Sequence, residues 1–102
     1  MIQHMVTYDG LDLKLDFRHY TNDRVALVLV DDSEGYDEDY TVATVNLPDV
    51  ELGEDEVIIK DYSENEGVYD ALYMSGVVSR VLRYVQTGFV KCPICKLLIH
   101  QE

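Results

Sequence analysis

Two cysteines near the C-terminal end have the clearest spacing for chemistry in this chain. They form Cys92-Pro93-Ile94-Cys95, and His100 follows after four intervening residues. Two thiolates separated by two residues can bind one zinc ion from a tight turn, so Cys92, Cys95 and His100 would supply three ligands. A structural zinc would hold a C-terminal tail, residues 89–102, that otherwise has little to bury. Inert thiols and a redox dithiol stay open as alternatives, because a single pair of this kind is only moderately specific.

Patterns typical of catalysis are missing from the sequence. The three histidines, His4, His19 and His100, lie in no recognisable zinc-protease or deaminase motif, and none is placed beside a nucleophile in a known pattern. There is also no glycine-rich loop of the kind that cradles phosphate groups. We therefore expect the chain not to be an enzyme.

An acidic loop is the second feature that could carry function. Six of the nine residues between Asp31 and Asp39 are carboxylates, and a second acidic segment spans 49–56. The first loop does not fit a calcium-binding EF-hand, because Tyr36 stands where the glycine is required. The residues expected to contact a partner are Asp31, Asp32, Glu34, Tyr36, Asp37, Glu38, Asp39, Glu54, Asp55 and Glu56.

The charge of the chain is strongly negative and unevenly distributed. Twenty acidic residues face eight basic ones, which gives a net charge of −12. Residues 1–66 hold eighteen acids and four bases, whereas residues 67–102 hold two acids and four bases. A polyanionic surface repels nucleic acid and attracts basic proteins, although acidity can also serve solubility alone. We expect both acidic segments to gather on one folded platform, where their carboxylates would take the place of phosphates on a basic partner.

The hydrophobic pattern predicts an α+β fold, with a mostly antiparallel sheet and one short helix packed on one face. Residues 11–17, LDLKLDF, alternate strictly, and Asp9-Gly10 before them favours a hairpin turn. The continuous apolar run 25–30 predicts a central strand that pairs across the acidic loop with 40–47. A helix capped by Ser63 should end near Met74 and Gly76. Strands are expected at 57–60, 77–86 and 89–91.

Length and composition predict one domain spanning residues 1–102. No apolar run approaches the roughly 20 residues that a membrane span needs, and the N-terminal residues lack the pattern of a signal peptide. We therefore expect a cytoplasmic protein, in which the two cysteines do not form a structural disulfide.

Three stretches resemble a family of small, uncharacterised bacterial proteins found on phages, plasmids and conjugative elements. They are RVALVLV from Arg24, YTVATVNLP from Tyr40 and IIKDYSENEGVYDAL from Ile58, and the resemblance covers roughly residues 24–90. Small acidic proteins of mobile elements often resemble inhibitors of host defence, including anti-CRISPR and anti-restriction proteins. The resemblance implies a class of function and assigns no role to any single residue.

The expected function is therefore inhibition of a basic, nucleic-acid-handling host protein, with a Cas9-type effector as the expected target. Such effectors hold guide and target strands in channels rich in Lys and Arg, and an acidic protein could block DNA loading there. The alternative is a non-enzymatic interaction module of a phage or conjugative element that carries a structural zinc site.

Overall fold

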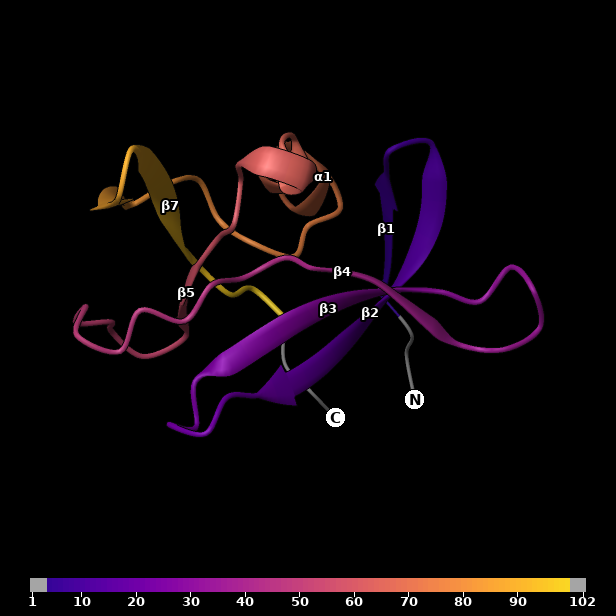
Figure 1. Cartoon of the computed structure of the whole chain (residues 1–102), viewed down its shortest axis with the longest axis horizontal. Coiled ribbons are helices and arrows are strands. Elements are labelled where there is room, and N and C mark those ends of the chain that lie inside the picture. The colour runs from indigo at the N-terminus through magenta and orange to yellow at the C-terminus, as the bar shows by residue number, and fades with distance from the viewer. Residues whose placement is uncertain (1–3, 100–102) are drawn as a thin grey trace.

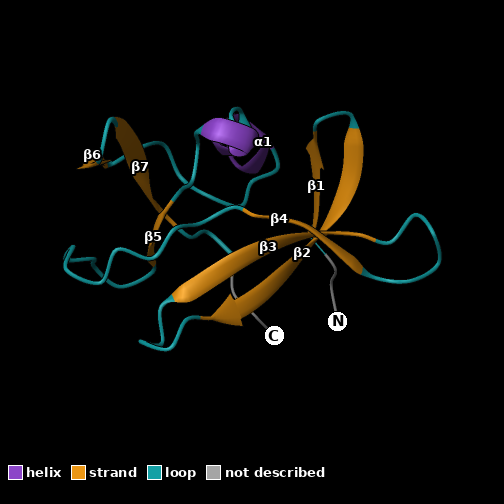
Figure 2. Cartoon of the chain, in the orientation of Figure 1, coloured by secondary structure: helices purple, strands orange, loops and turns teal. Residues whose placement is uncertain are grey.

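The computed structural model describes residues 4–99 and confirms the α+β class. In chain order the elements are β1 (Met5–Tyr8), β2 (Leu11–His19), β3 (Val25–Asp31), β4 (Glu38–Val42), β5 (Glu56–Ile58), a 3-10 turn (Ser63–Asn65), α1 (Val68–Met74), β6 (Arg83–Thr87) and β7 (Val90–Lys96). Figures 1 and 2 show two antiparallel sheets with α1 packed beside them. Within the described range, no helix is long and apolar enough to cross a membrane.

The first sheet is a meander in the order β1-β2-β3-β4. The alternation of β2 sends Leu13 and Leu15 into the core, and Leu15 lies opposite Leu29 of β3. Residues 26–30 of β3 are all buried, because a central strand is covered on both faces. Both hairpins expected from the sequence are therefore present.

The second sheet has the order β5-β7-β6, and a short joint connects it to the first. Thr44, just after β4, forms an antiparallel bridge with Ile59, just after β5. The amide of Val45 donates to the carbonyl of Ile58 over 3.1 Å. One edge of the first sheet thus continues into one edge of the second.

The Asp61 side chain holds the start of α1 in place. The Asp61 carboxylate accepts hydrogen bonds from the amides of Gly67 and Tyr69, at 3.0 and 3.1 Å. Asp61 therefore satisfies the free donors at the start of α1. Ser63 was expected to cap this helix, but it begins the 3-10 turn instead, and α1 starts only at Val68.

Asn65 is the only fully buried polar side chain in the described core. Its amide nitrogen donates to the carbonyl of Val42 over 2.7 Å, and its amide oxygen accepts from the Thr41 hydroxyl. The Tyr8 hydroxyl lies 3.2 and 3.1 Å from the carbonyl oxygens of Glu64 and Glu66. The Asn65 turn therefore fastens α1 to β4 and β1 together.

Two expectations for the C-terminal third are corrected by the sheet. The strand expected at 77–86 is regular only from Arg83, because the preceding residues make an isolated bridge between Val78 and Leu97. The strand expected at 89–91 continues through Lys96 and forms the centre of the second sheet. Residues 90–96 are therefore not a tail with little to bury.

The first prediction concerns Asn65. Replacing it with Ala (Asn65→Ala) removes the donor to the Val42 carbonyl and the acceptor for the Thr41 hydroxyl from a fully buried position, so the free energy of unfolding should fall by about 2 kcal/mol. Urea denaturation followed by circular dichroism measures this change. The control is Asn22→Ala, which removes an exposed amide that bonds the Asn46 side chain and the Arg24 amide and should change stability by less than about 0.5 kcal/mol. Equal effects of the two substitutions would contradict the role of Asn65.

Candidate partner-binding surface

The acidic loop lies where β3 and β4 extend beyond the rest of the sheet (Figure 1). Its turn is set locally, since the amide of Ser33 donates to the Asp31 carboxylate over 2.9 Å and that of Gly35 donates to the Asp32 carbonyl over 3.1 Å. Gly35 has a φ of 88°, a left-handed conformation that glycine adopts without strain. The hydrogen bond from the Ser33 amide lowers the pKa of Asp31.

A β-bulge directs Tyr40 toward the turn between β1 and β2. Leu29 pairs with Thr41, but Val30 pairs with Asp39, so Tyr40 is the extra residue on β4. Its hydroxyl donates to the Asp9 carboxylate over 2.6 Å, which raises the pKa of Tyr40. The acidic loop and the β1–β2 turn therefore belong to one end of the molecule.

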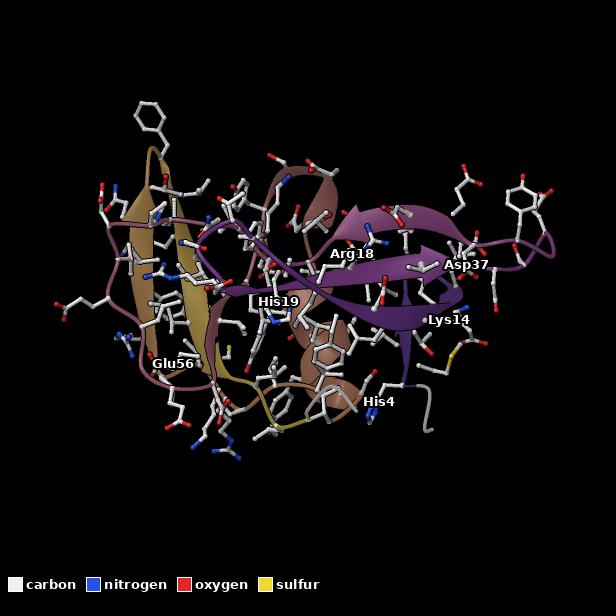
Figure 3. The ribbon with its side chains drawn as sticks, turned by 90° about the horizontal axis from the view of Figure 1, so that it is seen from below. His4, Lys14, Arg18, His19, Asp37 and Glu56 are labelled. Atoms are coloured by element: carbon white, nitrogen blue, oxygen red, sulfur yellow. The ribbon has the colours of Figure 1, made fainter. Side chains whose placement is uncertain are left out.

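Basic side chains of β2 partly neutralise this end. Lys14 Nζ lies 2.8 Å from the Asp37 carboxylate and 3.9 Å from that of Asp32. Arg18 binds Asp39 through two nitrogens, at 2.7 and 2.8 Å. These hydrogen bonds from Arg18 lower the pKa of Asp39. Figure 3 shows Lys14 and Arg18 on the side of β2 that faces Asp37.

Most of the carboxylates at this end nevertheless remain uncompensated. Nine acids and two bases lie on β2, its preceding turn and the acidic loop, which leaves a local charge of −7. We call this set the acidic end; it comprises Asp9, Asp12, Lys14, Asp16, Arg18, Asp31, Asp32, Glu34, Asp37, Glu38 and Asp39. Within residues 4–99, Glu34 and Glu38 have no ion-pair partner, and Tyr36 between them is 60% exposed.

The second acidic segment does not join the first on one platform. Figure 1 shows the loop before β5 at the opposite end of the long axis from the loop between β3 and β4, and Figure 3 likewise separates Glu56 from Asp37. The molecule measures 38 Å along that axis. Arg24 fixes the loop before β5 by donating to the carbonyls of Leu47 and Val50. The expectation of a shared platform is therefore wrong for residues 49–56.

One carboxylate of this second segment is held inside the molecule. Glu56 pairs with Arg83 over 2.7 Å and accepts from the amide of Gly53, and both bonds lower its pKa. Glu54 and Asp55 are exposed and have no ion-pair partner among residues 4–99. Asp49 and Glu51 are likewise exposed and in no ion pair among these residues, so both ends present free carboxylates and the acidic end carries the larger acidic set.

The structure places Cys92 and Cys95 within β7 rather than in a tight turn. Residues three apart in a strand point to opposite faces. Cys92 accordingly packs with Ile58 and Ile94, whereas Cys95 packs in the main core. Both thiols are free and fully buried, and burial raises the pKa of each, for Cys95 to about 12.

The described arrangement does not bring the two thiols to one ion. Among residues 4–99, no group of three or more His, Cys, Asp or Glu side chains is placed to hold a metal. His100 lies outside the described residues. Zinc at Cys92, Cys95 and His100 therefore stays a prediction, and the observed geometry assigns the described thiols a packing role.

Comparison with known proteins finds no relative of this chain. No family model matches the chain, and no curated protein or solved structure is similar to it. The three stretches that suggested a mobile-element family have structural roles here. RVALVLV supplies Arg24 and β3, YTVATVNLP supplies β4 and the joint between the sheets, and the third stretch supplies Asp61 and Asn65.

Sequence reasoning missed that Lys14 and Arg18 neutralise part of the loop. The signal was present, because strict alternation in 11–17 places Lys14 on the polar face of β2. Pairing of β2 with β3 then sets Lys14 opposite Val30, next to the loop.

The second prediction separates packed thiols from zinc-bound thiols. Because Cys92 and Cys95 are buried and protonated, they should react with a thiol reagent at pH 8 only when the protein unfolds. The reaction rate should be the same after dialysis against a metal chelator. Metal analysis of the untreated protein provides the control. A fast reaction that begins only after zinc is removed would show that the metal, rather than packing, protects the thiols.

Proposed function

We propose that this chain is a non-enzymatic inhibitor from a mobile genetic element that acts in the cytoplasm of a bacterial host. Its acidic end would bind a basic protein that handles nucleic acid. The observation that carries the proposal is the charge of −7 at one end of a small domain, with exposed Glu34, Tyr36 and Glu38 at its tip. Carboxylates presented on a rigid hairpin can meet Arg side chains in the paired geometry that phosphates also use.

A Cas9-type effector is the proposed target. Its channels for guide and target strands are lined with Lys and Arg, so an acidic domain can bind in them. Long-range attraction would raise the association rate and would weaken as salt is added. Tyr36 would contribute contact area at a small cost in conformational entropy. Blocking this channel would prevent loading of target DNA without any chemical step.

The internal ion pairs refine which residues would make contact. Asp37 and Asp39 already hold Lys14 and Arg18, so a partner would have to displace those cations before using their charge. Glu34 and Glu38 have no internal ion pair among the described residues, so a partner could bind them without displacing a cation. They are therefore the proposed centre of the contact, and Glu54 and Asp55 at the other end are peripheral to it.

The third prediction tests this local assignment by changing two charges at either end. Glu34→Gln with Glu38→Gln should weaken binding to the effector by about 2- to 30-fold, because an exposed ion pair contributes about 0.2–1 kcal/mol. The matched control, Glu54→Gln with Asp55→Asn, removes the same net charge and should change affinity less. Titration calorimetry at low salt measures both. Equal losses would mean that overall charge, and not the acidic end, determines binding.

The fourth prediction tests the target itself. Purified protein, added to a Cas9-type effector with its guide before target DNA, should slow cleavage, and the inhibition should fade as salt rises. Adding target DNA first should abolish the inhibition, because the channel is then occupied. Absence of inhibition and of a complex on gel filtration at low salt would remove this target. Capture of a protein encoded by the same mobile element would then support the interaction-module alternative.

A further inference from the structure

Strand β6 is an edge of the second sheet, and it pairs with no further strand among the described residues. Figure 2 shows α1 beside β1, and the Tyr8 hydroxyl bonds to the carbonyls just before that helix. The edge beyond β4 is occupied at its end, where Asn65 bonds the Val42 carbonyl and Thr44 then forms a bridge with Ile59. Within the described residues, β6 pairs only with β7, so one side of its backbone has no strand partner.

The register shows which backbone groups of β6 face outward. Pro93 lies opposite Tyr84, has no amide hydrogen, and accepts from the Ile59 amide on the side of β5. Tyr84 and Pro93 are therefore a pair without mutual hydrogen bonds. Since such pairs alternate with bonded ones in antiparallel strands, the backbone groups of Tyr84 and Gln86 point away from β7.

Large apolar side chains accompany this open edge. Leu82 is 52% exposed, Tyr84 is 61% exposed, and Phe89 at the tip of the hairpin is fully exposed. Edge strands are usually protected by charge. The only charged residue of β6 is Arg83, and it is turned across the sheet to Glu56 and to the carbonyl of Glu51. The edge therefore lacks the usual protection against strand pairing.

We infer that β6 pairs in antiparallel fashion with β6 of a second copy, about a two-fold axis at Val85. In this register Tyr84 of each copy lies opposite Gln86 of the other. Both residues have outward backbone groups, so each pair can exchange two hydrogen bonds, and the two sheets become one. Gly88 falls opposite Leu82 of the second copy, which brings the exposed Leu82 and Phe89 side chains together.

The distribution of charge favours a second copy as the occupant. Residues 75–99 contain four bases and no acid, whereas the rest of the chain is strongly acidic. Strand β6 itself therefore brings no carboxylate to a second copy, and Glu56, the carboxylate that contacts it, is paired with Arg83. The register places Arg83 opposite Thr87 of the second copy, so no like charges face each other directly. Lys91 lies one strand further out, where salt screens its repulsion.

The fifth prediction is a weak dimer that salt strengthens. Two chains of charge −12 repel at long range, so sedimentation at about 100 µM protein should show more dimer at 0.5 M than at 0.05 M NaCl. Gln86→Pro removes an outward amide hydrogen without breaking a bond to β7, and should reduce dimerisation at least tenfold. Gln86→Ala keeps that amide and should dimerise like the unchanged chain.

A second pair of variants tests the apolar contact without altering the backbone. Tyr84→Lys with Phe89→Ser should give a monomer, whereas Tyr36→Lys with Met74→Ser changes equally exposed side chains elsewhere and should leave the dimer intact. Circular dichroism verifies that all variants fold. A chain that is monomeric at every salt concentration, or a dimer indifferent to both β6 variants, would overturn the inference. So would a dimer that salt dissociates, because that would indicate pairing of acidic and basic surfaces.

Discussion

The structure depends on the joint between its two sheets. Neither sheet is large, and a domain of 102 residues has little stability to spare. The bridge between Thr44 and Ile59 connects the sheets, and the buried amide of Asn65 holds the next turn against β4. That turn also carries Tyr8 contacts and leads into α1, so one short segment fixes the helix, the core and both sheets. Burying this amide is favourable because both of its ends find partners on β4, the Val42 carbonyl and the Thr41 hydroxyl.

This joint also determines where charge lies. It places β3 and β4 with their acidic loop at one end of the long axis and the second sheet at the other (Figure 1). The larger cluster of uncompensated carboxylates lies at one end, and the other end carries the apolar edge of β6 together with the smaller acidic loop before β5. The two ends respond to salt in opposite ways. Contacts made by the acidic end weaken as salt rises, whereas contacts made by β6 are relieved of repulsion.

Local pattern in the sequence predicted the elements better than it predicted their arrangement. Alternation in 11–17 and the apolar run 25–30 gave the first two hairpins correctly, because side-chain period in a strand is set locally. The Cys-x-x-Cys spacing suggested a tight turn, whereas both cysteines lie within β7, a central strand that also contains Pro93. Pro93 fits there because its missing amide falls in a pair that makes no bond to Tyr84, while its carbonyl serves β5. Nothing local in SENEG marks Asn65 as buried.

The shared acidic platform failed for a related reason. Charge along a sequence says how many carboxylates a segment carries, but their positions depend on the path of the chain between segments. Here residues 43–50 cross the molecule, and Arg24 secures the far loop by binding backbone carbonyls rather than carboxylates. Lys14 and Arg18, which the composition counts as bases, form ion pairs with Asp37 and Asp39 of the acidic loop. Counting charges therefore overstated the surface available at both segments.

A dimer through β6 would change how the acidic ends bind a partner. Because β6 and the acidic loop lie at opposite ends of the long axis, a dimer through β6 would carry its two acidic ends on its far sides. A partner with two basic surfaces could then be held by both ends, and the second contact would form at high effective concentration. Such a dimer would be favoured where the single acidic contact is weakest, at higher salt. Weak pairing of β6 would thus allow the acidic ends to hold a basic partner at ionic strengths where a single acidic end binds too weakly.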